Sequence, residues 1–368
     1  MKILPNNLQR QHDINANEYN SKAIDVLNSG WYVLGKEVKE FEEEFSKYIG
    51  VKHCVGLASG LDALQIAFRI LGLKENDEVI VCSNAYIACV MGITVNGATP
   101  IFVEPDEYDN LDVNKIEEKI TNNTKAILAV HLYGQSCDMS KICEVASKYN
   151  LKVVEDCAQA HGTKWNNNNV GTFGDIACWS FYPTKNLGAF GDGGAITTNN
   201  DEYADQVRII RNYGASKTHY DNELIGMNSR LDELQAGLLR VKLSHLDELN
   251  NERISIANRY NNEVNNPLIK PLQTRPGSNN VYHQYVVHVS NGKRDVLMEY
   301  LKSYEIGTII HYPIPSPLQT AYKYLGYKKG DFPIAERYAN EVLSLPMYNG
   351  MSKQEQDYII EKLNSFKG

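Results

Sequence analysis

The sequence predicts an α/β protein with a large, mostly parallel sheet and a smaller α+β domain after it. Between residues 50 and 200, short β-branched runs alternate with longer helical patterns, which is typical of βαβ units. A long stretch with apolar residues at helical spacing follows, and the last hundred residues have a strand and helix pattern of their own. The 368 residues are 43% hydrophobic, so the chain can bury one large core and a second, smaller one.

The expected strands of the large sheet are apolar at most positions, as buried parallel strands are. They lie at residues 78–81, 99–103, 126–131 and 152–155, with two more at 177–181 and 194–198. Apolar residues at helical spacing continue from 232 to 261, so we expect one long helix that bridges two domains. A segment rich in Pro, Asn and Gly follows, and then we expect a strand at 285–289 and a helix at 294–304. The expected domains are residues 1–245, with the N-terminal segment, and residues 246–368.

Composition argues against several classes of function. The net charge of −8 and the pI of about 5.7 are unlike those of a protein that binds nucleic acid or an anionic membrane surface. The sequence has no apolar stretch of membrane length and no signal-peptide core at its start. Seven cysteines, several of them inside apolar runs, are typical of the reduced thiols of a cytoplasmic protein. Their spacing and that of the nine histidines do not indicate a metal site.

One lysine has an unusual setting. Lys185 follows the aromatic and hydroxyl side chains of residues 180–184 and precedes a glycine-rich run, on the connection between the last two expected strands. An ordinary lysine has a pKa of about 10.4, whereas a lysine in a water-poor pocket is partly unprotonated and can form a Schiff base. Because most lysines lie at the surface, a second observation is needed to favour the nucleophile.

That observation is the carboxylate of Asp156. The apolar run before it is typical of a buried parallel strand, and Asp156 comes at the end of that strand. In open α/β sheets, ligands bind at the carboxyl ends of the strands. An aspartate there could also cap the next helix. The presence of both Asp156 and Lys185 favours a cofactor site.

These two segments resemble the fold-type I pyridoxal phosphate enzymes, and specifically the nucleotide-sugar aminotransferases of the DegT/StrS type. The resemblance extends along most of the chain, because further segments match landmarks of the family in the same order. They are residues 29–35, 38–42, 58–64, 228–235 and 311–313. The resemblance implies a fold-type I aminotransferase, with a large α/β/α domain and a small C-terminal α+β domain.

The resemblance also implies pyridoxal phosphate as the cofactor and assigns side chains to it. Lys185 would bond the aldehyde and then carry protons, and Asp156 would pair with the protonated ring nitrogen. Tyr86 would stack on the ring, and Gln159 would hydrogen-bond the ring oxygen. For Tyr86 the alternative is a core tyrosine, and for Gln159 it is a solvated loop residue.

The phosphate would be held at the start of a helix. Ser59, Gly60 and Leu61 precede a helical pattern, and the free N–H groups of a helix N-terminus attract anions. Many family members have threonine where Leu61 stands, so only main-chain donors are expected there. Ser180 would add a hydroxyl, and Asn228 resembles a residue that reaches the phosphate from the neighbouring subunit. The resemblance thus implies a homodimer with shared active sites.

Four residues are candidates for contacting the substrate, with packing as the alternative for each. His161 follows Gln159 by two residues and resembles a feature of the family branch that aminates C3 of a 6-deoxy sugar. Tyr182 lies close to Lys185, and His311 and Tyr312 belong to the segment that resembles the nucleotide-sugar contact region.

The resemblance implies transfer of an amino group from L-glutamate to C3 of a dTDP-3-keto-6-deoxyhexose. The alternatives are amination of a nucleotide-linked 4-keto sugar and a pyridoxal phosphate-binding regulator without catalysis. A nicotinamide-dependent oxidoreductase would need a Gly-x-Gly-x-x-Gly motif, and the glycines of residues 188–194 lack that spacing. The sequence leaves open the configuration at C4, the nucleotide and the pathway, whether O-antigen, another surface glycan or an antibiotic sugar.

Overall fold

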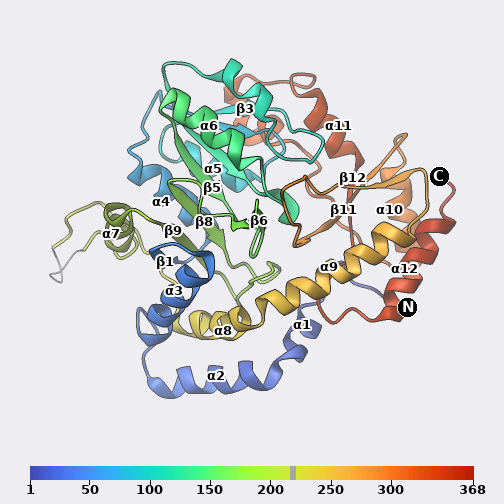
Figure 1. Ribbon diagram of the computed structural model, residues 1–368, viewed down its shortest axis with the longest axis horizontal. Coiled ribbons are helices and arrows are strands. Elements are labelled where there is room, and N and C mark those ends of the chain that lie inside the picture. Colours follow the sequence, from blue (N-terminus) through green and yellow to red (C-terminus); the bar gives the residue numbers. More distant parts are fainter. Residues whose placement is uncertain (216–220) are drawn as a thin grey trace.

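The computed structural model describes residues 1–215 and 221–368, and its centre is a seven-stranded sheet (Figure 1). The strand order is β1-β9-β8-β5-β4-β2-β3. The strands are β1 (His53–Leu57), β2 (Glu78–Cys82), β3 (Thr99–Val103), β4 (Thr124–Val130), β5 (Lys152–Asp156), β8 (Ile176–Ser180) and β9 (Gly194–Thr198). Only β9 runs antiparallel to its neighbours in this sheet. The predicted mostly parallel α/β sheet is confirmed.

Helices pack on both faces of this sheet. The helices of the larger part are α1 (Leu8–Ile14), α2 (Ala16–Ser29), α3 (Lys36–Ile49), α4 (Gly60–Ile70), α5 (Ile87–Thr94), α6 (Met139–Tyr149), α7 (Asp201–Ile210) and α8 (Glu233–Ser244). Successive side chains of β8 enter different core clusters, because strand residues alternate between faces. Cys178 joins a cluster with Phe68 of α4, and Trp179 joins one with Phe41 and Phe45 of α3. A two-stranded hairpin, β6 (Lys164–Trp165) and β7 (Asn168–Asn169), lies between β5 and β8 in the chain.

The segment expected to be one long helix is two helices, so that prediction is wrong. The break between α8 and α9 (Leu246–Glu263) falls at His245, whose φ of −107° and ψ of 2° are not helical. The two helices serve different cores: Leu239 of α8 packs with the large sheet, and Tyr260 of α9 packs in the C-terminal part. The helical spacing of apolar residues continues through the break, because a turn at a single residue does not change the spacing before or after it. The sequence pattern therefore gave no sign of the break.

The C-terminal part is built on a three-stranded antiparallel sheet. It contains β10 (Ile269–Pro271), β11 (Tyr285–Val289), β12 (Val342–Leu345), α10 (Arg294–Ser303), α11 (Pro333–Glu341) and α12 (Lys353–Ser365). The strand and helix predicted near 285–289 and 294–304 are confirmed. Ile3 also lies in this core, since its N–H donates to the carbonyl of Glu305 at 2.9 Å and its carbonyl accepts from Gly307 at 2.9 Å. The first residues therefore pack with the smaller part rather than with the large sheet.

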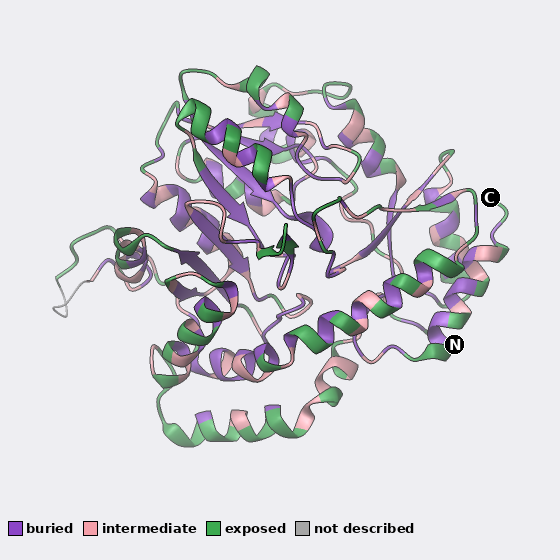
Figure 2. Cartoon of the chain, in the orientation of Figure 1, coloured by how far each residue is buried: buried purple, intermediate pink, exposed green. Residues whose placement is uncertain are grey.

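The outer surface near α2 is unusually apolar. Figure 2 shows α2 exposed along most of its length, below the buried strands. Ile24 and Leu27 on this helix are each 57% exposed, and Trp31 just after it is 64% exposed. No helix within residues 1–215 and 221–368 combines the length and apolar character that crossing a membrane requires.

Candidate active site

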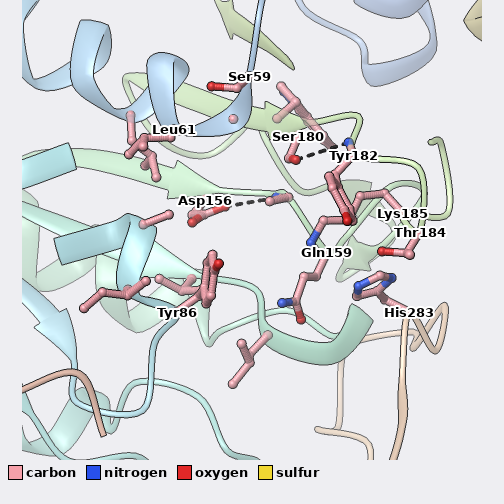
Figure 3. A pocket seen from close by; sticks show the side chains of 18 of the residues that line it. Ser59, Leu61, Tyr86, Asp156, Gln159, Ser180, Tyr182, Thr184, Lys185 and His283 are labelled. Atoms are coloured by element: carbon pink, nitrogen blue, oxygen red, sulfur yellow. Dashed lines mark hydrogen bonds between the residues drawn. The ribbon is translucent and has the colours of Figure 1, made fainter. Parts of the chain in front are cut away.

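A cavity of about 540 Å³ opens at the carboxyl ends of the parallel strands, where open α/β sheets bind ligands. Its walls come from the ends of β5 and β8, the starts of α4 and α5, the loop after β8 and residues 311–312 (Figure 3). The sequence-predicted residues that line it are Ser59, Gly60, Leu61, Tyr86, Asp156, Gln159, Ser180, Tyr182, Lys185, His311 and Tyr312.

Lys185 lies on the tight connection between β8 and β9. Its backbone N–H donates to the carbonyl of Tyr182 at 2.8 Å, and the loop then folds back on itself. A Cβ on Gly188 would lie 2.4 Å from the carbonyl oxygen of Pro183, so only glycine permits this close approach. Removal from water lowers the pKa of Lys185 to about 8, although the negative charge of Asp156 acts in the opposite direction. A substantial fraction of the amine is thus neutral near physiological pH.

Asp156 ends β5 and faces the same space as Lys185 (Figure 3). Each of its carboxylate oxygens has one donor from the protein. Oδ1 accepts from the N–H of Ala158 at 3.0 Å, and Oδ2 accepts from the thiol of Cys89 at 3.1 Å. A carboxylate has further lone pairs, so Asp156 can also accept from a ligand in the cavity.

The start of α4 provides an anion site. The Oγ of Ser59 accepts from the N–H of Asp62 at 3.1 Å and so caps the helix. The N–H groups of Gly60 and Leu61, as the first two of the helix, have no carbonyl within it to bind. A Cβ on Gly60 would lie 2.6 Å from the Cβ of Ser180, so glycine lets the hydroxyl of Ser180 come close to these donors. Two main-chain donors and a hydroxyl at a positive helix end suit a phosphate.

The amide of Gln159 is held in one orientation. Its Oε1 accepts from the N–H of Tyr133 at 2.7 Å, and its Nε2 donates to the hydroxyl of Tyr312 at 3.2 Å. A backbone N–H can only donate, which identifies the oxygen of the amide. The NH₂ group therefore remains on the cavity side as a donor for an oxygen of the ligand.

Aromatic and imidazole groups form the rest of the wall. The ring of Tyr86, just before α5, lies 4.9 Å from that of Tyr312 at an interplanar angle of 31°. Nδ1 of His311 is 2.8 Å from the hydroxyl of Ser344. Burial, followed by the charge of Lys185, lowers the pKa of His311 to about 4, so its imidazole is neutral. Tyr182 is 53% exposed at the rim.

Comparison with known proteins identifies the family of this chain. The model of the DegT/DnrJ/EryC1/StrS aminotransferase family matches residues 13–364. The chain belongs to this family. The dTDP-3-amino-3,6-dideoxy-alpha-D-galactopyranose transaminase of Aneurinibacillus thermoaerophilus is 51% identical over 342 residues, which are 93% of each chain.

Solved structures agree with the family assignment. DesV of S. venezuelae, in complex with a ketimine intermediate, has a TM-score of 0.96 and 40% identity, and the match covers 99% of this chain and 98% of DesV. A sugar aminotransferase from Streptococcus pneumoniae, Spr1654, is solved in a PLP form with a TM-score of 0.90, 28% identity and 95% coverage of both chains. The fold-type I architecture is thereby confirmed, and the protein is a pyridoxal phosphate-dependent aminotransferase.

The residues of the cavity fit this cofactor. The partly neutral Lys185 suits the aldehyde, and the carboxylate of Asp156 suits a protonated ring nitrogen. The donors at Gly60 and Ser180 suit the phosphate, because a side chain at position 60 would fill the space beside them. The second N–H of the Gln159 amide, which is not used by Tyr312, suits the ring oxygen.

Two residues that the sequence analysis assigned to the site of this aminotransferase do not line its cavity. The ring of His161 is fully buried, 5.4 Å from that of Trp179 and 5.8 Å from that of Phe181. The chain turns beneath β8 after Gln159, and burial lowers the pKa of His161 to about 3. Neither ring nitrogen has a hydrogen-bond partner among the residues that the structure describes. The structure therefore places this histidine in a packing position behind the cavity.

The other residue, Asn228, is exposed and forms a bridge with Asn212. Its neighbour Ser229 is buried, donates to Oδ2 of Asp62 at 2.6 Å and accepts from the N–H of Ala58 at 3.1 Å. The segment is thus anchored next to the start of α4, whereas Asn228 itself faces outward.

The cavity also contains residues that the sequence analysis missed, among them Thr184, Asp192 and His283. Nδ1 of His283 is 3.3 Å from Oδ1 of Asn186, whose Nδ2 donates to Oδ1 of Asn250 at 2.8 Å. His283 must therefore carry a proton on Nδ1, which leaves Nε2 as an acceptor. Burial, followed by the charge of Lys185, lowers the pKa of His283 well below its usual range. The only signal in the sequence is a polar residue just ahead of a strand.

A buried group of potential metal ligands lies beside the cavity, which one of its members also lines. His131, Glu155 and Cys157 place their ligand atoms within 4.8 Å of one another. Glu155 accepts from His131 Nε2 at 3.0 Å and from the N–H groups of Gly171, Phe173 and Gly174. Nδ1 of His131 accepts from the N–H of Cys137 at 3.1 Å, so Nε2 carries the proton and donates to Glu155. The carboxylate is thus used in holding the loop after β7.

Proposed function

We propose that the protein transfers an amino group from L-glutamate to C3 of a dTDP-linked 3-keto-6-deoxyhexose, which gives a dTDP-3-amino-3,6-dideoxyhexose. The observation that carries the proposal is Lys185, with a pKa lowered to about 8, facing Asp156 across one cavity. The choice of sugar is supported by the transaminase that is 51% identical to this chain.

The residues predicted to hold the cofactor would have distinct roles in this reaction. Pyridoxal phosphate, when bound, supplies an electron sink for the electron pair released at the reacting carbon. Lys185 bonds the cofactor at rest and, once free, moves a proton to and from the reacting carbon. Asp156 holds the proton on the ring nitrogen, and Gln159 donates to the ring oxygen. The start of α4 and the hydroxyl of Ser180 would bind the phosphate, and Tyr86 would stack on the ring.

Part of the cavity wall is suited to the neutral, hydroxyl-rich ring of a sugar. His283 and His311 are neutral, and Tyr182 and Tyr312 present phenol groups. Among the described residues that line it there is no arginine, so these residues offer no fixed clamp for the carboxylates of glutamate. This agrees with two dissimilar substrates that use the same cavity in turn.

We infer a homodimer in which each active site receives Asn228 from the partner subunit. Asn228 is exposed and lies outside its own chain's cavity, yet Ser229 anchors it beside the phosphate site. The apolar side chains exposed on α2 and at Trp31 form a surface that a second copy would cover. We also assign the enzyme to the cytoplasm, because all seven cysteines are free and six are buried.

Visible absorption of the cofactor-loaded enzyme tests the proposed function. The enzyme is first treated with L-glutamate. Transfer of the amino group to the cofactor should remove the band of the lysine-bound cofactor. The dTDP-3-keto-6-deoxyhexose, made in situ, is then added, and return of the band shows that the sugar has accepted the nitrogen. The amino sugar is identified by mass spectrometry.

Each other outcome points to a different function. If glutamate removes the band but only a 4-keto sugar restores it, the protein is a 4-aminotransferase. A protein that binds the cofactor but converts neither amino donor nor sugar would be a regulator, as the sequence analysis weighed. Failure to form the band with added pyridoxal phosphate would contradict the role of Lys185.

A further inference from the structure

The carboxylate of Asp156 is held by a thiol that belongs to another element of the fold. Cys89 lies in the first turn of α5 and is only 1% exposed. Its Sγ lies 3.1 Å from Oδ2 of Asp156, which is 67 residues later in the chain. The other oxygen of Asp156 binds a backbone N–H of its own loop. The thiol is thus the one side chain among the described residues that donates to this carboxylate.

The direction of this hydrogen bond is fixed. Burial raises the pKa of Cys89 well above its usual range, and the negative charge of Asp156 raises it further. The sulfur therefore stays protonated, and an ionised carboxylate can only accept. The S–H group is a donor to Oδ2 of Asp156.

We propose that Cys89 is a positioning residue for transamination, because its thiol orients the carboxylate of Asp156 and stabilises the negative charge that would pair with the ring nitrogen of the cofactor. The proposal rests on the function proposed above and adds a residue to it. A donor to the charged form of a carboxylate favours that form, and an ionised Asp156 keeps the ring nitrogen positive. Cys89 thereby strengthens the electron sink without touching the reacting atoms.

The position of Cys89 also links two parts of the cofactor site. Its N–H donates to the carbonyl of Tyr86 at 3.0 Å, in the same first turn of α5. Tyr86 and Asp156 both line the cavity, where Tyr86 would hold the ring of the cofactor and Asp156 its nitrogen. The thiol therefore ties the helix that carries the aromatic group to the strand that carries the carboxylate.

The competing explanation is packing, since Cys89 belongs to the apolar core around β5 and α5. The two explanations rank two substitutions in opposite order. Cys89→Ala keeps an apolar side chain but removes the donor, whereas Cys89→Ser keeps a donor but puts a hydroxyl in the core. Packing favours alanine, and the hydrogen bond favours serine.

The test compares the two variants with the wild-type enzyme, each loaded with pyridoxal phosphate. The first readout is the pH midpoint at which the visible band of the lysine-bound cofactor changes. When the ring nitrogen is less positive, the nitrogen that joins Lys185 to the cofactor keeps its proton to higher pH. We expect the midpoint of Cys89→Ala to rise by roughly 0.5 pH unit and kcat to fall about threefold to tenfold. Cys89→Ser should restore most of both values.

Two results would overturn the proposal: an unchanged midpoint in Cys89→Ala, or a serine variant that is more impaired than the alanine variant. Thermal melting and the affinity of the apoprotein for pyridoxal phosphate show whether each variant folds and binds. Asp156→Asn serves as the reference. If it leaves the band and the turnover of the enzyme unchanged, the role of Asp156 itself is wrong, and that failure is separate from one of Cys89.

Discussion

The pKa of a single residue, Lys185, sets the pH at which the cofactor attaches. Burial lowers this pKa to about 8, so the neutral fraction should rise from about one-tenth at pH 7 to about nine-tenths at pH 9. We expect the rate at which apoprotein forms the visible band with pyridoxal phosphate to follow this curve, measured by stopped flow. Asp156→Asn should move the midpoint lower, because the charge of Asp156 favours the ammonium form. A wild-type midpoint near 10 would contradict the water-poor setting of this lysine.

Histidines show how far a sequence alone can place single residues. His161 follows Gln159 by two residues, yet its ring is packed against Trp179 behind the cavity. His283 is more than 120 residues away from Asp156 in the sequence, yet it lines the cavity. A motif places residues that share one strand end, such as Asp156. A residue that another domain brings to the site, such as His283, has no fixed sequence distance from such a motif. The motif therefore cannot predict it.

At the scale of an element, a substitution at the start of α4 should raise the affinity for pyridoxal phosphate. Leu61 lines the cavity at the second position of this helix, where it contributes a backbone N–H but no hydroxyl. We expect Leu61→Thr to bind pyridoxal phosphate about tenfold more tightly, since a hydrogen bond to a charged group is stronger than one between neutral groups. Equilibrium titration of the apoprotein measures this affinity.

Leu61→Val is the matched control, because valine has the shape of threonine without its hydroxyl. It should bind the cofactor no more tightly than the wild type does. Pyridoxal without phosphate should bind equally well to all three proteins. An equal gain for valine and threonine would mean that side-chain shape, and not the hydroxyl, limits the affinity.

Elements differ in how well the sequence predicts them. The strands β2, β3, β4 and β5 were predicted because apolar, β-branched runs are buried on both faces of the sheet. The break at His245 was not, since a change in the direction of the chain leaves the apolar period of α8 and α9 intact. Helix α2 was not predicted either, because its apolar residues are divided between the core side, with Tyr19 and Val26, and the outer surface, with Ile24 and Leu27.

At the scale of the whole molecule, the chain has exposed apolar side chains and a predicted phosphate-binding residue that lies outside its own cavity. Trp31 is 64% exposed, and Asn228 is exposed beside the start of α4. A two-fold axis would satisfy both conditions, because in such a dimer each surface patch meets its own copy. The phosphate site of one chain has main-chain donors and hydroxyls but no amide side chain from residues 221–235. In the inferred dimer, the partner subunit would supply this amide.

Mixed dimers test this arrangement directly. Lys185→Ala removes the nucleophile, and Asn228→Asp places a negative charge where the partner would meet the phosphate, so each homodimer should be inactive at low cofactor concentration. Co-expression of the two chains with different affinity tags yields mixed dimers. In these, one site combines an intact Lys185 with an intact Asn228 from the other chain. Random pairing should therefore recover about one quarter of the wild-type sites, since half of the dimers are mixed and each has one good site. Activity that stays absent in purified mixed dimers would mean that Asn228 acts within its own chain, because then every site would carry one of the two substitutions.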